Sequence, residues 1–247
     1  MLSKSPLGSD LLSTLKQVPP VSAVLGETEG EVLSLDLAAR KPGSMLVLEE
    51  EQTNLLRNIA CSATMCASPE ELRIFVFTGN PEAWDFLYHT RHLVCLYTTR
   101  QMPAAAREIE IIKDETNSAR YHRAPADYPT STLLLVENLG EFRNRLSVSA
   151  LWLELLISSG YDGGTFVVAS EREENINDLE VYNTSFTHLC LGHIEPNPEL
   201  YHQIYNMLYL SDNLEIAAIP EQTYWVSRKK RRGWQAFTIP ELLTFVT

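Results

Sequence analysis

The sequence predicts an α/β protein with a mostly parallel central sheet and helices on both of its faces. Four apolar runs, at 45–48, 133–136, 165–171 and 187–193, have the composition of strands buried on both sides. The strands alternate with helical patterns of about ten to fifteen residues, which is the spacing of strand–helix–strand units. A chain of 247 residues, 45% of them apolar, can bury a core of that size.

The amino-terminal part of the chain is predicted to lead into this domain. We expect residues 1–20 to be a leader segment, with a short helical pattern that ends at Pro19 and Pro20, and residues 21–247 to form one domain. The alternation of apolar and polar residues over 31–39 predicts a half-buried strand at an edge of the sheet.

The first buried strand and the helix after it form the unit around which the sheet is predicted to be built. After the strand at 45–48, Leu55, Leu56 and Ile59 recur at helical spacing. Further predicted elements are strands at 72–79 and 92–99, helices at 81–90, 103–118, 146–160 and 198–210, and two short strands around a basic turn within 223–237.

The charge and composition of the chain argue against several classes of protein. The net charge of −12 disfavours nonspecific binding of the whole chain to nucleic acid or to anionic membrane. The four cysteines show no CxxC pairing, which favours reduced thiols in a cytoplasmic protein. No apolar run approaches the roughly 18 residues of a membrane span, so we expect no direct membrane insertion.

The loop between the first buried strand and its helix differs from a phosphate-binding loop. A P-loop reads G-x-x-x-x-G-K-[ST], because backbone amides must curl around the phosphates and a lysine must reach them. Here the loop reads EEEQTN, with Glu49, Glu50, Glu51, Thr53 and Asn54 at its candidate site positions. It has no glycine and no lysine, and three carboxylates stand where an anion would bind. Thr53 or Asn54 can cap the helix.

Several segments resemble the FtsK/SpoIIIE family of DNA- and protein-translocating ATPases over roughly residues 20–247. The segment LGETEGEVLSLDLAARKPGSMLVL resembles the approach to the Walker A loop, and LLLVENLGEF resembles the Walker B strand. SSGYDGGTFVVASERE resembles the sensor strand, and RRGWQAFTIPELL resembles the carboxyl-terminal hairpin that precedes the last helix. The resemblance implies a P-loop NTPase-like fold of the RecA/FtsK type with a carboxyl-terminal β-hairpin.

The catalytic positions depart from this family pattern. By the resemblance, Glu137 stands where the magnesium-linked aspartate is expected and Asn138 where the carboxylate that activates water is expected. Glu171 replaces the sensor glutamine, and Arg172 is retained. Asparagine cannot accept a proton from water, so the resemblance implies the fold without the ATPase activity. We therefore expect no catalytic residues, and these four positions together with the loop form a degenerate nucleotide site.

Other candidate sites are weaker. His188, Cys190 and His193 have side chains that can bind metal, but a fourth ligand is not evident and ordinary strand packing is favoured. The glutamates at 49–51 are hard oxygen ligands for a cation, although a solvated acidic loop is favoured. Ser170 lacks the G-x-S-x-G surroundings of a nucleophile. No metal site and no cofactor are predicted.

The only dense positive cluster lies near the carboxyl terminus, on a predicted hairpin turn. It consists of Arg228, Lys229, Lys230, Arg231 and Arg232, flanked by Trp225 and Trp234. Such a cluster can bind phosphate or an acidic partner, with the indoles stacking on bases or guanidinium planes. The alternative is a solubilising turn that prevents strand-to-strand aggregation.

These observations favour a catalytically inactive ATPase-like domain that serves as an interaction, scaffold or regulatory module. Degenerate modules of this kind occur in multi-ATPase translocation motors, including the ATPases of type VII secretion, so the resemblance implies DNA translocation or protein secretion. Other translocase subunits or a protein partner are expected, and an oligomer is compatible with the sequence. Two alternatives remain: a divergent ATP-driven translocase, and a nucleic-acid-binding module that uses the basic hairpin.

Overall fold

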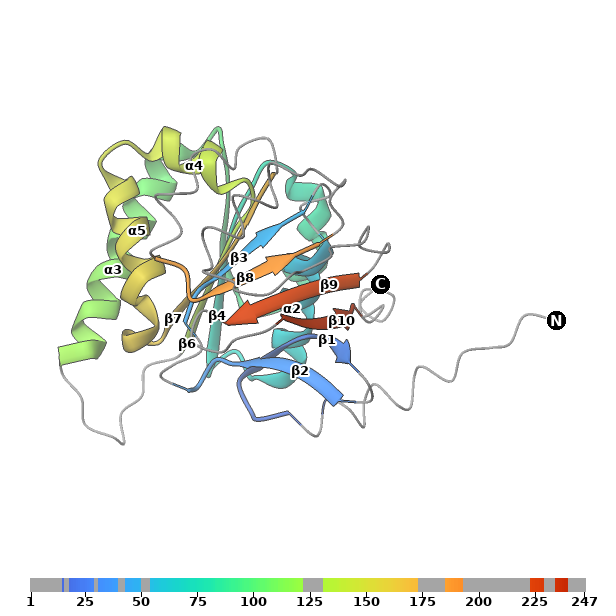
Figure 1. Ribbon diagram of the computed structural model, residues 1–247. Helices are drawn as coiled ribbons and strands as arrows, with labels where there is room; N and C mark the ends of the chain where they lie inside the picture. Colours follow the sequence, from blue (N-terminus) through green and yellow to red (C-terminus); the bar gives the residue numbers. More distant parts are fainter. Residues whose placement is uncertain are drawn as a thin grey trace.

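The computed structural model describes residues 15, 18–28, 31–39, 43–49, 54–121, 131–172, 185–192, 223–228 and 234–239. The strands within these residues form one ten-stranded sheet in the order β2-β1-β10-β9-β8-β3-β7-β6-β4-β5 (Figure 1). None of the helices in these ranges has the length and apolarity that a membrane crossing requires.

Six neighbouring strands of the sheet are parallel. In sheet order they are β8 (His188–Leu191), β3 (Met45–Leu48), β7 (Thr165–Glu171), β6 (Ser131–Val136), β4 (Leu72–Thr78) and β5 (Leu93–Thr98). Every residue of β3, β7 and β8 is buried. The apolar runs thus form strands buried on both faces, and the predicted mostly parallel α/β fold is confirmed.

Four antiparallel strands extend the sheet beyond β8. They are β9 (Thr223–Arg228), β10 (Trp234–Thr238), β1 (Ser22–Thr28) and β2 (Glu31–Asp36), with β2 outermost as its alternating pattern predicted. The strand β1 was not predicted from the sequence. Gly26 permits its close approach to β10, since a Cβ there would lie 2.3 Å from the Thr238 carbonyl oxygen. The residues between β9 and β10, 229–233, lie outside the described residues.

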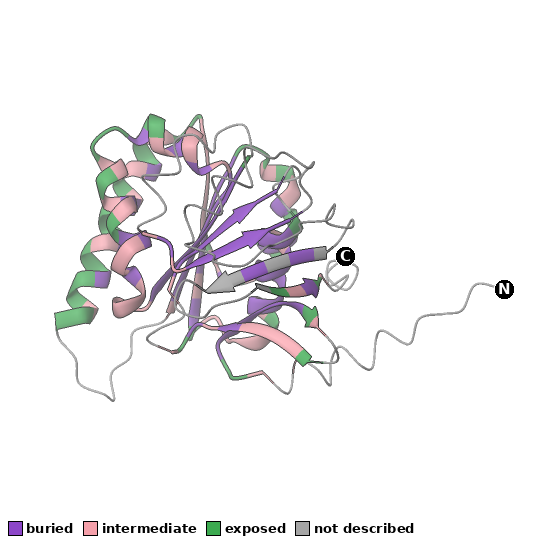
Figure 2. Cartoon of the chain, in the orientation of Figure 1, coloured by how far each residue is buried: buried purple, intermediate pink, exposed green. Residues whose placement is uncertain are grey.

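Helices cover both faces of the parallel strands, as predicted (Figure 1). α2 (Asn54–Cys66) and the 3₁₀ helix η1 (Pro81–His89) pack on one face, and α3 (Met102–Tyr121), α4 (Leu139–Leu146) and α5 (Ser149–Ser159) pack on the other. A short 3₁₀ helix, η2 (Gly160–Gly163), follows α5. The buried strands lie at the centre, while α3 and α5 expose their outer sides (Figure 2).

Side chains alternate between two apolar cores, one on each face of the sheet. Met45 and Val47 of β3 contact the core beneath α2, whereas Leu46 and Leu48 contact the core beneath α3, α4 and α5. The six residues expected to be buried in adjacent parallel strands are at most 2% exposed: Leu46, Val47, Leu134, Leu135, Val167 and Val168.

Two helices differ from their predicted form. The helix expected at 146–160 is α5 and begins later, at Ser149, because Ser147 has a φ of +54° and separates α5 from the preceding helix. That preceding helix, α4, was not predicted from the sequence. The helix expected at 81–90 is the 3₁₀ helix η1. The helix expected at 198–210 lies outside the described residues.

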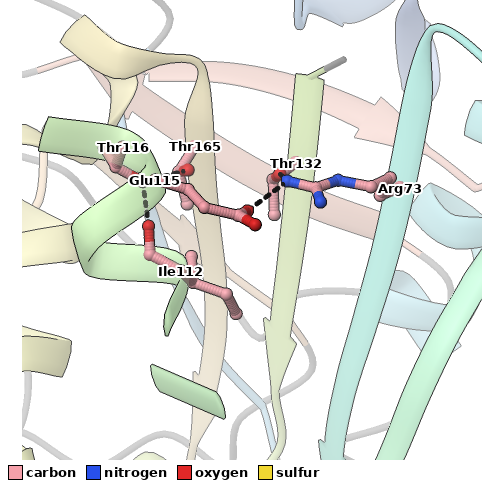
Figure 3. A network of polar contacts seen from close by, with 6 residues as sticks. All are labelled: Arg73, Ile112, Glu115, Thr116, Thr132 and Thr165. Atoms are coloured by element: carbon pink, nitrogen blue, oxygen red, sulfur yellow. Dashed lines mark hydrogen bonds and ion pairs between the residues drawn. The ribbon is translucent and has the colours of Figure 1, made fainter. Parts of the chain in front are cut away.

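A polar network joins α3 to the amino-terminal ends of β4, β6 and β7 (Figure 3). Arg73 donates from Nη2 to Glu115 Oε2 at 2.7 Å and to Thr132 Oγ1 at 3.2 Å. The Thr116 hydroxyl lies 2.6 Å from the Ile112 carbonyl oxygen and 2.7 Å from Thr165 Oγ1. These contacts fix α3 against the sheet at the edge opposite the candidate site.

Candidate functional site at the carboxyl edge of the sheet

Polar side chains gather at the carboxyl ends of four neighbouring strands. Glu49 follows β3, Glu171 ends β7, Glu137 follows β6 and Thr78 ends β4. Register places these ends side by side, because Leu48 pairs with Glu171 and Phe77 with Val136. Sheets of this kind bind their ligands at this edge.

The three glutamates are almost completely buried, but they do not share one face. Their exposed fractions are 3% for Glu49, 4% for Glu137 and 1% for Glu171. Alternation along the strands places Glu49 and Glu137 on the α2 face of the sheet, while Glu171 contacts α4 on the other face. A buried carboxylate costs several kcal/mol unless it is paired or hydrogen-bonded, so each one requires internal partners.

Glu137 uses both carboxylate oxygens in contacts within the protein. The Thr78 hydroxyl donates to Oε2, and the indole Nε1–H of Trp84 donates to Oε1 at 3.0 Å. Burial raises the pKa of Glu137 to about 7, although these hydrogen bonds and the nearby Arg57 guanidinium oppose the rise. The carboxyl group is therefore partly protonated near neutral pH.

Glu171 and Asn138 contact the start of α4. Glu171 Oε2 accepts a hydrogen bond from the Gly140 backbone N–H at 2.5 Å, and Glu171 Oε1 accepts one from the Arg172 N–H at 2.9 Å. Asn138 has a left-handed backbone, with φ of +56°, and its Nδ2 donates to Glu141 Oε2 at 3.2 Å. Glu137, Asn138 and Glu171 thus lie at one edge of the sheet, as expected. Glu137 contacts side chains on the α2 face, whereas Asn138 and Glu171 contact the start of α4 on the other face.

Glu49 directly follows β3 and is buried. The Tyr224 hydroxyl of β9 donates to Glu49 Oε2 at 2.7 Å, and the Glu49 backbone N–H donates to the Glu171 carbonyl oxygen at 3.4 Å. The buried Cys190 thiol has a raised pKa, because of burial and the nearby Glu49 carboxylate. Asn54 begins α2 and is exposed, whereas Glu50, Glu51 and Thr53 lie outside the described residues.

Three observations on the described residues bear on magnesium binding at this edge. Within the described residues no group of three or more His, Cys, Asp or Glu side chains could hold a metal ion. The carboxylate at the position expected for magnesium already accepts hydrogen bonds from Thr78 and Trp84. The residue after β3, where the phosphate-binding loop would begin, is a buried glutamate.

Sequence reasoning missed the partners of the buried carboxylates. The partners Thr78, Trp84, Arg57 and Tyr224 lie far in sequence from the glutamates that they contact. Trp84 and Glu137 are 53 positions apart, and Tyr224 and Glu49 are 175 positions apart. No local pattern carries such pairings. The only local signal was a tryptophan, Trp84, five positions after the end of the strand predicted at 72–79.

The other sequence candidates are placed as follows. Ser170 is fully buried on β7, and its hydroxyl makes no hydrogen bond among the described residues. On β8 the His188 ring contacts Thr187 Oγ1 through Nδ1 at 2.9 Å, and His193 lies outside the described residues.

The basic cluster is described only in part. Trp225 and Arg228 belong to β9, and Trp234 begins β10. The placement of these three side chains, and of residues 229–232, lies outside the structural description. Use of this cluster for a partner therefore stays a prediction.

Comparisons with solved structures identify the fold. No family model matches the chain, and no curated protein matches it. The structure aligns with the cytoplasmic domain of the type VII secretion ATPase EccC from Thermomonospora curvata, with a TM-score of 0.68 and 16% identity, over 90% of this chain and 29% of that one. The fold is that of the FtsK/SpoIIIE-type ATPase domains.

Two further structures carry the same likeness. EssC from Geobacillus thermodenitrificans, comprising ATPases 2 and 3, aligns with a TM-score of 0.66 and 9% identity, over 92% of this chain and 46% of that one. The pCW3 conjugation coupling protein TcpA, in its monomer form with ATPγS, aligns with a TM-score of 0.62 and 11% identity, over 94% of this chain and 72% of that one. The chain thus spans less than half the length of the type VII ATPase chains that it resembles.

Proposed function

We propose that this chain is a catalytically inactive ATPase-fold domain that serves as an interaction, scaffold or regulatory module of a translocation complex. The observation that carries the proposal is that Glu137 is buried and hydrogen-bonded within the protein. The carboxylate at the expected magnesium position accepts hydrogen bonds from the side chains of Thr78 and Trp84 and is 4% exposed.

The sequence of the phosphate loop supports the same proposal. EEEQTN has no glycine for close backbone approach and no lysine to contact phosphate. Like charges repel, so carboxylates at 49–51 raise the cost of placing a polyphosphate beside them. Asn138 cannot activate water as a base, which removes the hydrolytic step as well.

The translocation role rests on the likeness in fold. The proteins whose structures align with this chain include type VII secretion ATPases and a conjugation coupling protein. In one of the similar structures, ATPases 2 and 3 of Thermomonospora curvata EccC are bound to a signal sequence peptide. We infer that this chain works beside active ATPase domains in a machine that moves protein or DNA.

Nucleotide binding provides the primary test. ATP with magnesium at 100 times a dissociation constant would stabilise the fold by about 2.7 kcal/mol, and we expect no such stabilisation in a thermal-shift titration. We also expect no phosphate release above buffer. A rise in melting temperature with ATP that persists in Glu82→Ala, an exposed site on η1, and disappears in Glu137→Ala would contradict the proposal.

The module role needs a second experiment. We expect the chain, co-expressed with the FtsK/SpoIIIE-type ATPases of its own genome, to form a complex of fixed stoichiometry with one of them by size-exclusion chromatography with light scattering. Failure to associate with any of these ATPases would contradict the module role, and it would leave the nucleotide result unaffected.

A further inference from the structure

We propose that Glu137 has a structural role, in which its hydrogen bonds connect the end of β6 to β4 and η1. We call this set of hydrogen bonds the tie, and we propose that it blocks the position at which a magnesium ion would bind Glu137. The proposal deepens the proposed function by naming what the retained carboxylate now does. It predicts that replacing Glu137 changes the stability of the folded protein, which loss of activity alone would not do.

The tie is a short chain of hydrogen bonds between three elements. The Asn80 backbone N–H donates to Thr78 Oγ1 at 2.9 Å, and the Thr78 hydroxyl donates to Glu137 Oε2. The Trp84 indole N–H donates to Glu137 Oε1 at 3.0 Å. Thr78 and Trp84 are fully buried, so bulk water cannot replace Glu137 as the acceptor of their hydrogen bonds. Loss of Glu137 would leave two buried donors without an acceptor.

The segment that the tie holds has little stability of its own. η1 is a nine-residue 3₁₀ helix, whereas 3₁₀ runs longer than about four residues are uncommon because their hydrogen-bond geometry is poor. Three of its side chains, Trp84, Phe86 and Leu87, are buried in the core beneath α2. The Trp84 and Phe86 rings are stacked, with centroids 6.1 Å apart. The Glu137 contact orients the Trp84 indole at the centre of this packing.

The same contacts oppose metal binding. Magnesium usually keeps several of its own water molecules when a carboxylate binds it, so the carboxylate must face an open, hydrated space. At Glu137 an indole N–H faces one oxygen and a hydroxyl faces the other, and the side chain is nearly inaccessible. A hydrated ion could bind only after Thr78 or Trp84 had moved away.

The alternative is a carboxylate that is held ready for a ligand. Functional groups of that kind are retained at a cost to stability, so their replacement commonly stabilises a protein. Removal of the tie should instead destabilise the folded protein, because the buried donors of Thr78 and Trp84 would lose their acceptor. The sign of the stability change therefore separates the two cases.

The first test compares two substitutions at one position. Glu137→Leu keeps the approximate size of the side chain but removes both acceptors, and we expect the melting temperature to fall by about 5 °C or more. Glu137→Gln can accept from Trp84 through its carbonyl oxygen and donate to Thr78 Oγ1, so it should retain most of the wild-type melting temperature. Glu82→Leu on the exposed side of η1 is the matched control and should cause little change.

A second variant keeps the test decisive if Glu137→Leu fails to fold. Thr78→Val removes one hydroxyl with little change in shape, and we expect a fall of about 2–4 °C. Combined with Glu137→Gln, it should give a non-additive change, because the two residues are in contact. Additive effects in this double-mutant cycle would contradict the tie.

A direct readout comes from the Trp84 indole proton. In ¹⁵N NMR, with the resonance assigned by its loss in Trp84→Phe, the proton should exchange slowly in the wild type and at least tenfold faster in Thr78→Val. Millimolar Mg²⁺ alone should leave this resonance unshifted. A Mg²⁺-dependent shift, or a Glu137→Leu variant more stable than the wild type, would overturn the proposal.

The outcomes separate this proposal from the proposed function. ATP binding by a protein whose Glu137→Leu variant is destabilised would leave the tie standing and refute the inactive-module proposal. Absence of ATP binding together with a stabilised Glu137→Leu variant would refute the tie alone.

Discussion

The two edges of the parallel sheet differ in how far their charged side chains are buried. At the amino ends of the strands, the ion pair with α3 is partly exposed to solvent, whereas at the carboxyl ends three carboxylates are almost completely buried. The Arg73–Glu115 ion pair at the amino edge has side chains that are 33% and 49% exposed (Figure 3). The carboxyl-edge glutamates are 1–4% exposed and accept hydrogen bonds from within the protein.

This difference indicates that the two edges contribute to stability in different ways. An exposed ion pair contributes little, because water screens it and two long side chains must be ordered. A buried carboxylate makes the folded state depend on each hydrogen bond that satisfies it, because removal of a partner leaves an uncompensated group. Substitutions should therefore be more costly at the carboxyl edge than at the amino edge.

The largest effect is expected at Glu171. Glu171→Ala removes the acceptor for the Gly140 N–H at the start of α4, and we expect the free energy of unfolding to fall by roughly 2–3 kcal/mol. Chemical denaturation measures this change. The neighbouring exposed Arg172→Ala serves as the control. An effect below that of the Arg73–Glu115 pair would contradict the contrast between the edges.

A pH-dependent effect of intermediate size is expected at Glu137. Its folded-state pKa of about 7 lies above the ordinary value of 4.5, so the folded protein binds more protons than the unfolded chain between these values. Stability should consequently fall as the pH rises through this window, by up to about 1 kcal/mol per pH unit.

Glu137→Gln should remove this contribution and flatten the dependence of unfolding free energy on pH between about 4.5 and 7. Denaturation midpoints measured at several pH values test it, with Glu82→Gln as an exposed control. An unchanged slope in Glu137→Gln would show that the carboxyl group titrates normally in the folded state.

The smallest effect is expected at the amino edge. Glu115→Ala should lower the unfolding free energy by less than about 1 kcal/mol, and added salt should reduce even that loss. Denaturation at low and high ionic strength measures it. A loss that equals the Glu171→Ala value and does not change with salt would indicate that this edge, too, depends on buried charge.

Much of the candidate site could be located from sequence, because it follows from strand order. The polar residues after 45–48 and 133–136 and at the end of 165–171 were expected to meet, since parallel strands bring their carboxyl ends to one edge. Their hydrogen-bond partners could not be predicted. Trp84 belongs to a different unit of the fold, and nothing local distinguishes a core tryptophan from one that donates to a carboxylate.

The sequence by itself determined the layered α/β fold, because apolar runs and helical periodicity are local consequences of which face each residue must bury. It also determined the composition of the EEEQTN loop. Only the tertiary structure decided the break at Ser147, the addition of β1 beside β10, and the contacts of Glu137 with Thr78 and Trp84. These features depend on approach between segments distant in sequence, where packing and the cost of an unsatisfied buried group outweigh local preference.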